Sequence, residues 1–256
     1  MNILITNDDG IYSEGLTALV QEMSEIANIT VVAPDRERSA TAHAITMHKP
    51  LRTEKIHIPN SKASVWKVNG TPSDCVKLAL EALLDFTPDL VLSGINRGPN
   101  LGTDVIYSGT VSAAIEAALS GIPAIALSII SHNHNYENVS FNSAAQIVKK
   151  LCMQILERVF PEDSLLNINI PSVEQDEIVG VAVTRLGTIK YKNSFDRRMD
   201  PRGKIYYWLA GEAIDNDEIG SDVWAVKNNY ISITPLLFDL TKYEVIETLK
   251  KWDLQI

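Results

Sequence analysis

A short apolar run at the start of the chain ends abruptly in two carboxylates and a glycine, Asp8, Asp9 and Gly10. The residues Ile3–Ile5 are consecutive and do not alternate with polar residues, which predicts a strand covered on both faces, as in a parallel sheet flanked by helices. Ligands of such sheets bind beyond the carboxyl ends of the strands, where the two carboxylates would lie. An Asp-Gly hairpin turn is the alternative. The helical spacing of apolar residues over 16–23 argues against it and predicts the order strand, acidic loop, helix.

Strand-like and helix-like patterns alternate over the first part of the chain. Buried strands are also predicted at 28–33 and 88–96, and further strands at 124–130, 165–170 and 178–184. β-Rich pieces are predicted at 51–58 and 64–68, and helices from residue 72 onward, at 111–119 and at 141–159. Thr71 suits the cap of the helix that begins at Pro72, and Asp74 adds a carboxylate to its first turn. The alternation predicts an α/β fold built on a doubly wound, mostly parallel sheet with right-handed crossovers.

The pattern changes after Arg185. Residues 186–235 lack a clear helical period, and the turn sequence DPRG at 200–203 precedes an aromatic strand at 205–209. This part of the chain is typical of a β-hairpin that leaves the core.

We therefore expect two parts, a core over 1–185 and a C-terminal excursion over 186–256. The second part is predicted to end in a helix over Lys242–Trp252. Exposed aromatic hairpins often form subunit contacts, so the excursion is predicted to make oligomers. A cap over the active-site end of the core is the alternative.

The composition excludes several classes of protein. Of the 256 residues, 45% are apolar and 21% charged, as in an ordinary soluble globular protein. The 23 basic and 32 acidic side chains leave a formal charge of −9, which argues against binding of long nucleic acid through a basic surface. No stretch approaches the ~18 consecutive apolar residues of a membrane span, and no leader pattern precedes the first strand. Cys75 and Cys152 lie in helix-like patterns without a CxxC pair, which predicts buried free thiols and a cytoplasmic protein.

Polar side chains follow two further predicted strands. Ser39 lies in the loop after the second strand, and Asn96 ends the third. Taken alone, Ser39 is more typical of a helix cap than of a ligand. Together with Asp8 and Asp9, these residues would bring two carboxylates, a hydroxyl and an amide oxygen to one edge of the sheet. Such hard oxygen donors suit Mg²⁺, Mn²⁺ or Ca²⁺ and not zinc or copper.

The histidines do not extend this set. His43 and His48 flank the run after Ser39, and His132 and His134 lie in a polar linker, all without the spacing of a metal-binding helix motif. We therefore expect them to be structural or exposed.

A glycine-rich loop over 97–110 opens onto the small-residue helix predicted at 111–119. Backbone N–H groups at a helix start, beside Gly109 and the hydroxyls of Ser108 and Thr110, suit a phosphate. The loop has neither the Gly-Lys-Ser/Thr ending of a P-loop nor the dinucleotide fingerprint. A long surface loop with a glycine-assisted turn is the alternative, but loops of this length in compact domains tend to be functional.

A divalent ion held by only two charged ligands leaves room for water and for a phosphate oxygen. Such an ion can polarise the phosphorus centre and activate a bound water, so the residues predict metal-dependent phosphate-ester hydrolysis. A signalling receiver domain also holds Mg²⁺ with paired acidic residues, but it is much shorter and needs an aspartate where this chain has Asn96. A nucleotide-binding regulatory module, which would bind without turnover, is a third hypothesis.

Seven segments of the chain together resemble the SurE survival-protein nucleotidases. They are ILITNDDG (3–10), APDRERS (33–39), NGTPSDCV (69–76), SGINRGPNLG (93–102), YSGTV (107–111), DPRG (200–203) and SITP (232–235). The resemblance extends over nearly the whole chain, and the combination of these segments in this order is highly specific.

The resemblance implies a Rossmann-like core and one divalent metal ion per subunit, Mg²⁺ or Mn²⁺, with Ca²⁺ able to occupy the site. It also implies hydrolysis of nucleoside 5′- and 3′-monophosphates by a metal-activated water, and in some members activity on short polyphosphate. The matching metal ligands are Asp8, Asp9, Ser39 and Asn96, of which Asp8 and Asp9 are the catalytic carboxylates, and the phosphate side matches Asn96, Ser108, Gly109 and Thr110.

The same resemblance implies homodimers or homotetramers built through the C-terminal part. Two positions there depart from the family pattern. Asn229 stands where the family has glycine, and Ile189 stands where a basic residue is common. All four metal-ligand positions are intact.

Overall fold

The fold was described from a computed structural model, which describes residues 1–58, 61–131, 135–137, 139–161, 163–193, 195–215, 218–252 and 254–255. The central sheet contains β1 (Asn2–Thr6), β2 (Asn28–Pro34), β3 (Thr53–Ile56), β4 (Ser64–Val68), β5 (Leu90–Arg97), β6 (Ala124–Ile130), β7 (Ser164–Pro171), β8 (Gly180–Val183) and β13 (Tyr230–Leu237). The helices are α1 (Glu14–Met23), α2 (Pro72–Leu78), α3 (Gly109–Leu119), α4 (Phe141–Leu156), α5 (Asp222–Lys227) and α6 (Tyr243–Lys250). A π-helical turn, Ala79–Leu83, extends α2, and 3₁₀ turns lie at Gly102–Tyr107 and Gln175–Glu177. His132 and His134 lie outside the described residues.

Within the described residues the central sheet has nine strands in the order β3-β4-β2-β1-β5-β6-β7-β13-β8. The pairs β3/β4 and β7/β13 are antiparallel, and the other neighbouring pairs are parallel. The order reverses at β1, since β2 pairs on one side of it and β5 on the other. This reversal is the kind of place where α/β sheets bind ligands. The predicted α/β, mostly parallel sheet is confirmed.

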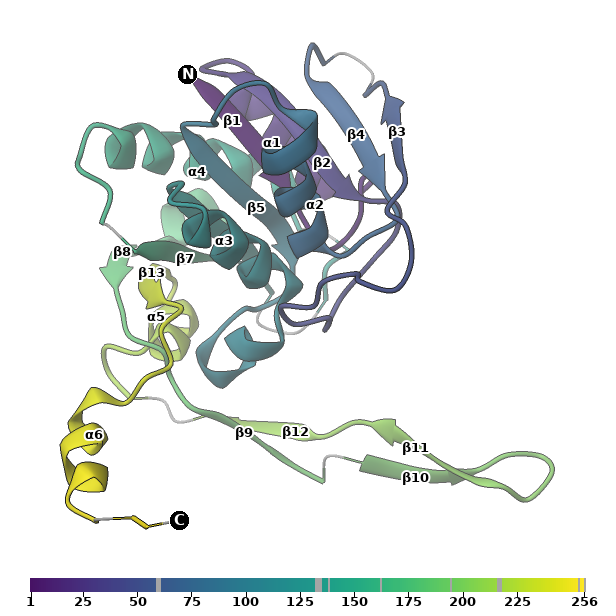
Figure 1. Ribbon diagram of the computed structural model, residues 1–256, viewed down its shortest axis with the longest axis vertical. Helices are drawn as coiled ribbons and strands as arrows, with labels where there is room; N and C mark the ends of the chain where they lie inside the picture. The colour runs from purple at the N-terminus through teal and green to yellow at the C-terminus, as the bar shows by residue number, and fades with distance from the viewer. Residues whose placement is uncertain are drawn as a thin grey trace.

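Helices cover both faces of the sheet (Figure 1). The apolar residues of α1 and α4 pack on one face with Ile3 and Ile5. Those of α2 and α3 pack on the other face with Leu4. The consecutive apolar residues of β1 therefore alternate between two separate cores, as predicted from their lack of polar alternation.

Local caps fix where the helices next to the sheet begin. The Thr71 hydroxyl accepts a hydrogen bond from the Asp74 backbone N–H at 3.0 Å, and the Asp74 carboxylate accepts one from the Thr71 N–H at 2.8 Å. This reciprocal capping box, with Pro72 in the first turn, confirms the predicted start of α2. The Ser13 and Ser108 hydroxyls cap α1 and α3 more simply, each by accepting a hydrogen bond from the backbone N–H three residues further on.

A long two-stranded arm leaves the body of the molecule (Figure 1). Its base pairs β9 (Ile189–Lys192) with β12 (Glu212–Asp215), and its outer part pairs β10 (Phe195–Met199) with β11 (Ile205–Leu209). The Asp200 carboxylate closes the turn at the tip by accepting hydrogen bonds from two backbone N–H groups. The predicted C-terminal hairpin is therefore present.

The chain returns to the central sheet after the arm. β13 pairs with β7 over Ser232–Leu237 and with β8 over Tyr230–Ile233. The strand β13 therefore belongs to the central sheet although it follows residue 185, because pairing between distant segments decides where a strand lies.

The helix α5 is not among the predicted elements. Its six residues are too few to establish a helical period, although Ser221 caps it and Asp222 lies in its first turn. The predicted terminal helix is present as α6, which lies away from the sheet (Figure 1). Among the described residues, no helix combines the length and the apolar character needed to cross a bilayer. Cys75 and Cys152 are buried and free, as predicted.

Asn229 follows α5 in the left-handed region, with a φ of 60°. Glycine adopts this conformation without strain, and asparagine tolerates it better than most residues. Asn229→Ala is expected to lower the free energy of unfolding by about 1 kcal/mol, whereas Asn229→Gly is expected to keep or raise it. Urea unfolding of both variants measures this contrast. Equal stability of the alanine and glycine variants would contradict the backbone explanation.

Candidate functional site

Asp8 lies two residues beyond β1 and is only 4% exposed. Its carboxylate accepts a hydrogen bond from the Thr110 hydroxyl at 2.6 Å and another from the Thr110 backbone N–H at 3.2 Å. Thr110 lies in the first turn of α3, where the N–H groups and the helix dipole favour negative charge. Asp8 therefore joins the end of β1 to the start of this helix.

Asp9 reaches the end of the neighbouring strand. Its Oδ2 accepts a hydrogen bond at 3.0 Å from the backbone N–H of Arg97, the residue after Asn96. The Asn96 side-chain amide donates to the Gly98 carbonyl at 3.0 Å. Because β1 and β5 are adjacent and parallel, both carboxylates and Asn96 lie at one end of the sheet.

The two carboxylates are held where a negative charge is costly. Burial raises the pKa of Asp8 to about 6, and the hydrogen bond from Thr110 offsets only part of that effect. Burial also raises the pKa of Asp9, whereas the hydrogen bond from the Arg97 N–H lowers it. The groups that donate to them are a hydroxyl and two backbone N–H groups, all neutral. Such a pair favours a bound cation or a proton over two bare charges.

Ser39 follows Arg38, whose backbone contacts Asp8 of the acidic pair. The backbone N–H of Arg38 donates to the Asp8 carbonyl at 2.7 Å. The Ser39 hydroxyl itself is exposed and donates to Glu37 at 2.8 Å. The interpretation of Ser39 as a helix cap is wrong, because the residues after it form a loop and not a helix.

The start of α3 packs tightly against Asp8. A Cβ atom added at Gly109 would lie 2.9 Å from Asp8 Cβ and 3.0 Å from Asp8 Oδ2. The Ser108 hydroxyl accepts a hydrogen bond from the Val111 N–H at 3.0 Å and so serves as the N-cap of the helix. Gly109 and Thr110 are thus brought against the acidic pair, and Ser108 fixes the helix start beside them.

Gly109→Ala is expected to displace the Asp8 carboxylate and to lower kcat about a hundredfold, since small misplacements of a reacting group carry penalties of that size. Gly121→Ala is the control for a loss of stability alone: nothing lies within 4 Å of a Cβ atom at that position, but its φ of 73° is unfavourable for alanine, so this variant should unfold more easily and keep its kcat. Steady-state kinetics and thermal unfolding of both variants measure the effect. Full activity of Gly109→Ala would show that the close approach is not needed.

Two sets of residues that the sequence analysis did not single out hold the loop before α3. In the first, Asn100 donates its N–H to Asn169 at 3.1 Å, and its carbonyl accepts from Asn167 at 2.8 Å and from Asn169 at 3.0 Å. In the second, the Asp222 carboxylate accepts from the Gly102 N–H at 2.8 Å and the Gly187 N–H at 2.7 Å. The sequence held one signal for the first set: asparagines interrupt the apolar strand β7, and an asparagine at a buried strand position requires hydrogen-bond partners.

These contacts also tie the base of the arm to the loop. The Thr103 hydroxyl donates to the Ile189 carbonyl at 2.7 Å, and Ile189 packs beside Leu101 and Val223. Ile189 is therefore an apolar anchor of β9.

The oxygen donors at this end of the sheet fit a divalent ion of the magnesium type. Two carboxylates, an amide and a hydroxyl belong to the preferred ligands of Mg²⁺, Mn²⁺ and Ca²⁺. In the part of the chain that the structure describes, no group of three or more His, Cys, Asp or Glu side chains is arranged to hold a metal ion. An ion here would therefore combine the two carboxylates with neutral oxygens.

The family model described as "Survival protein SurE" matches residues 3–193. Proteins named 5′-nucleotidase SurE are similar over nearly their whole length. The one from Pelotomaculum thermopropionicum is 55% identical over 253 residues, covering 98% of this chain and 95% of the relative. The one from Carboxydothermus hydrogenoformans is 57% identical over 256 residues, covering 98% of this chain and 96% of the relative.

A solved structure agrees with these sequence matches. The crystal structure of the SurE protein from Aquifex aeolicus is 42% identical, covers 99% of this chain and 100% of its own, and superposes with a TM-score of 0.87. Because both the family model and the relatives match most of its length, the chain belongs to the SurE family.

Proposed function

We propose that this protein is a divalent-metal-dependent phosphohydrolase that removes phosphate from nucleoside 5′-monophosphates. The observation that carries the proposal is the contact of Asp8 with the first turn of α3. It puts a cation-binding acidic pair beside an anion-binding helix start, and a phosphate monoester bound to a metal needs both. The name 5′-nucleotidase, which the similar proteins carry, supports the same reaction.

In this proposal the metal ligands are Asp8, Asp9, Ser39 and Asn96. Magnesium or manganese is the proposed ion, with one ion per subunit and with calcium able to occupy the site. When bound, the ion supplies a Lewis acid that polarises the phosphate and lowers the pKa of water. The cost of holding a negative charge on buried Asp8 and half-buried Asp9 supports this assignment, since a bound cation offsets that cost.

The protein's own groups bind and orient the phosphate. The backbone N–H of Gly109 at the start of α3 suits a non-bridging oxygen, and the Asn96 amide suits the oxygen on the side of β5. Thr110 gives its N–H and its hydroxyl to Asp8 and so positions that carboxylate beside the phosphate. Ser108 keeps the helix start in place through its bond to Val111. With the substrate fixed by neutral donors, the acidic residues remain available to the cation and to a proton.

Phosphate release in the presence of Mn²⁺ tests the substrate class. Nucleoside 5′-monophosphates are expected to be hydrolysed fastest, with 3′-monophosphates and short polyphosphate as further proposed substrates. p-Nitrophenyl phosphate, which lacks a nucleoside, serves as the comparison. If nucleotides bind but none is turned over with any metal, a regulatory nucleotide-binding module takes the place of this proposal.

We propose that the arm assembles the protein into homodimers or homotetramers. The outer part of the arm exposes more than half of the surface of five large apolar residues, Phe195, Met199, Tyr207, Trp208 and Leu209. Apolar surface of this kind is typical of an interface. Because the net charge is −9, long nucleic acid is not a proposed partner. A membrane is not a proposed partner either, and the cytoplasm is the proposed location.

Removal of residues 193–211 is expected to yield smaller particles. Lys192 and Glu212 face each other at the base of the arm, so a short glycine turn can join them without changing the rest of the fold. Light scattering of the shortened and complete proteins measures the mass. An unchanged mass would contradict assembly through the arm.

A further inference from the structure

One loop spans both halves of the candidate site. This segment, residues 38–46, is called the Ser39 loop below. At its start, the Arg38 N–H donates to the Asp8 carbonyl at 2.7 Å. Four residues later, the Ala42 N–H donates to the Tyr107 carbonyl at 3.1 Å, directly before the start of α3. The Ser39 loop therefore runs from the acidic pair to the phosphate side, and Ser39 lies between these two contacts.

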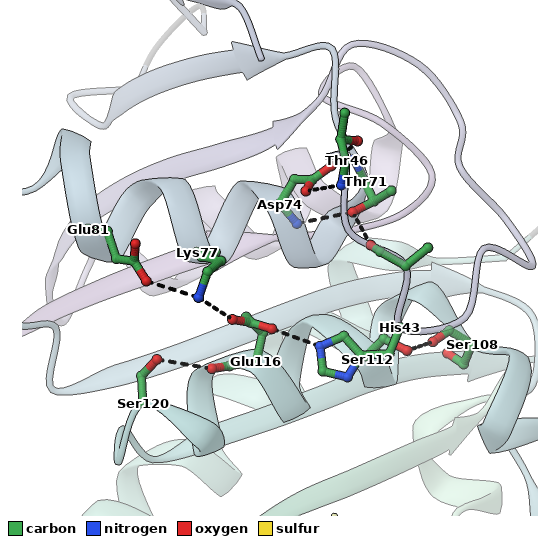
Figure 2. A network of polar contacts seen from close by, with 11 residues as sticks. His43, Thr46, Thr71, Asp74, Lys77, Glu81, Ser108, Ser112, Glu116 and Ser120 are labelled. Atoms are coloured by element: carbon green, nitrogen blue, oxygen red, sulfur yellow. Dashed lines mark hydrogen bonds and ion pairs between the residues drawn. The ribbon is translucent and has the colours of Figure 1, made fainter. Parts of the chain in front are cut away.

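The far end of the Ser39 loop is fixed to the start of α2. Thr46 donates to the Asp74 carboxylate through its N–H at 2.8 Å and through its hydroxyl at 2.6 Å. The Thr71 hydroxyl donates to the Ala44 carbonyl at 2.7 Å. Figure 2 shows that both contacts use the residues that cap α2. Asp74 is buried, so these hydrogen bonds lie away from solvent.

The middle of the Ser39 loop is held by a buried carboxylate. His43 Nε2 lies 2.8 Å from Glu116 Oε2, and Lys77 Nζ lies 3.3 Å from the other oxygen of Glu116. Glu116 projects from α3, and its side chain is only 9% exposed, whereas that of His43 is 31% exposed (Figure 2). Lys77 also pairs with Glu81 at 2.9 Å on the outer side of α2. A carboxylate buried between two nitrogen groups makes a stronger contact than an exposed ion pair.

The backbone of the Ser39 loop is strained at two positions. Ala40 and Ala42 have φ values of 54° and 50°, in the left-handed region that residues with a Cβ atom seldom adopt. Such a conformation is unfavourable for alanine and persists only where surrounding contacts impose it. His43 is adjacent to Ala42, so its bond to Glu116 is well placed to impose it. Without that bond the loop would relax, and Ser39 would move relative to Asp8.

We propose that His43 and Glu116 are positioning residues, which hold the Ser39 loop so that the Ser39 hydroxyl can serve the divalent ion. The inference rests on the proposed function, in which Ser39 is a metal ligand. It assigns a role to a contact outside the acidic pair. In this arrangement α3 positions the phosphate at its start, and it positions the serine ligand through Glu116, about two turns further along.

Mn²⁺ binding, measured by calorimetry on the complete protein without substrate, tests this role. His43→Ala is expected to weaken Mn²⁺ binding about tenfold, the size of effect seen when a group that supports a metal ligand is removed. His43→Gln, which keeps a donor nitrogen at a similar reach, is expected to restore most of the affinity. Glu81→Gln is the matched control and should leave Mn²⁺ affinity unchanged, because Glu81 contacts Lys77 but not the loop. In kinetics, His43→Ala should raise the half-saturating Mn²⁺ concentration with little change in kcat at saturating metal.

A double-mutant cycle with Ser39→Ala separates positioning from general destabilisation. If His43 acts through Ser39, the change His43→Ala should weaken Mn²⁺ binding in the wild-type background and have no further effect in the Ser39→Ala background. Additive losses, or unchanged Mn²⁺ affinity of His43→Ala in a wild-type protein that binds Mn²⁺, would overturn the inference. A wild-type protein that binds no Mn²⁺ and releases no phosphate would instead overturn the proposed function. Thermal unfolding of each variant confirms that the affinities refer to folded protein.

Discussion

Asp9→Asn is expected to lower kcat by about 10²–10³-fold, the penalty typical of removing one electrostatic group from a reacting site. Asp9 is tied to the end of β5 by the hydrogen bond that it accepts from the Arg97 N–H, and an asparagine oxygen can still accept this bond. The variant should therefore keep the fold and lose a negative charge from the acidic pair. Phosphate release at saturating nucleoside 5′-monophosphate and Mn²⁺ measures the loss.

The control for this change is Asp85→Asn. Asp85 is exposed in the turn before β5, at the opposite end of that strand from Asn96. The change Asp85→Asn removes the same charge from the protein without altering the acidic pair, so it should leave kcat unchanged. Near-normal turnover of Asp9→Asn, with Asp85→Asn also normal, would exclude Asp9 from the reaction.

The second large effect concerns stability. In metal-free protein, Asp8 has a pKa of about 6 against an ordinary value of 3.8, because burial disfavours its charged form. The folded state then holds the proton more tightly than the unfolded state. This stabilising contribution is complete below pH 3.8, and it is lost as the pH rises through about 6. At pH 7 the buried charge costs about 2–3 kcal/mol, from 1.36 kcal/mol per pKa unit.

Asp8→Asn removes this dependence on pH. In EDTA, the free energy of unfolding of the variant relative to wild type is expected to rise by about 2–3 kcal/mol between pH 4 and pH 7. Urea unfolding at both pH values measures the difference, and Asp85→Asn again provides the control. Saturating Mn²⁺ should stabilise the wild type more than the variant. A difference that does not change with pH would mean that the Asp8 charge is not destabilising in the folded protein.

Local patterns were sufficient to predict most of the sheet and the acidic end of it. Consecutive apolar residues such as Ile3–Ile5 identify buried strands, and the polar residues directly after them are placed by the strand itself. Asp8, Asp9 and Asn96 meet because β1 and β5 are parallel neighbours. The cap at Thr71 and the helix start at Ser108 were equally local, since each depends on contacts within a few residues.

Contacts between distant segments could not be predicted in this way. The carboxylate of Asp222 meets Gly102 across 120 residues, and Glu116 meets His43 across 73. Nothing near these residues in the sequence identifies their partners, so His43 was expected to be merely structural or exposed. The return of β13 to the sheet depends in the same way on pairing with β7, which lies far from it in the chain.

Phosphate release by metal-stripped protein tests the central claim most directly. The protein is treated with EDTA, assayed with a nucleoside 5′-monophosphate, and assayed again after Mg²⁺ or Mn²⁺ is added back. We predict no release in EDTA and restored release with either ion, with Asp9→Asn about 10²–10³-fold slower than wild type after the ion is restored. Full release in EDTA, or none after either ion is restored, would contradict a metal-dependent reaction at the acidic end of the sheet.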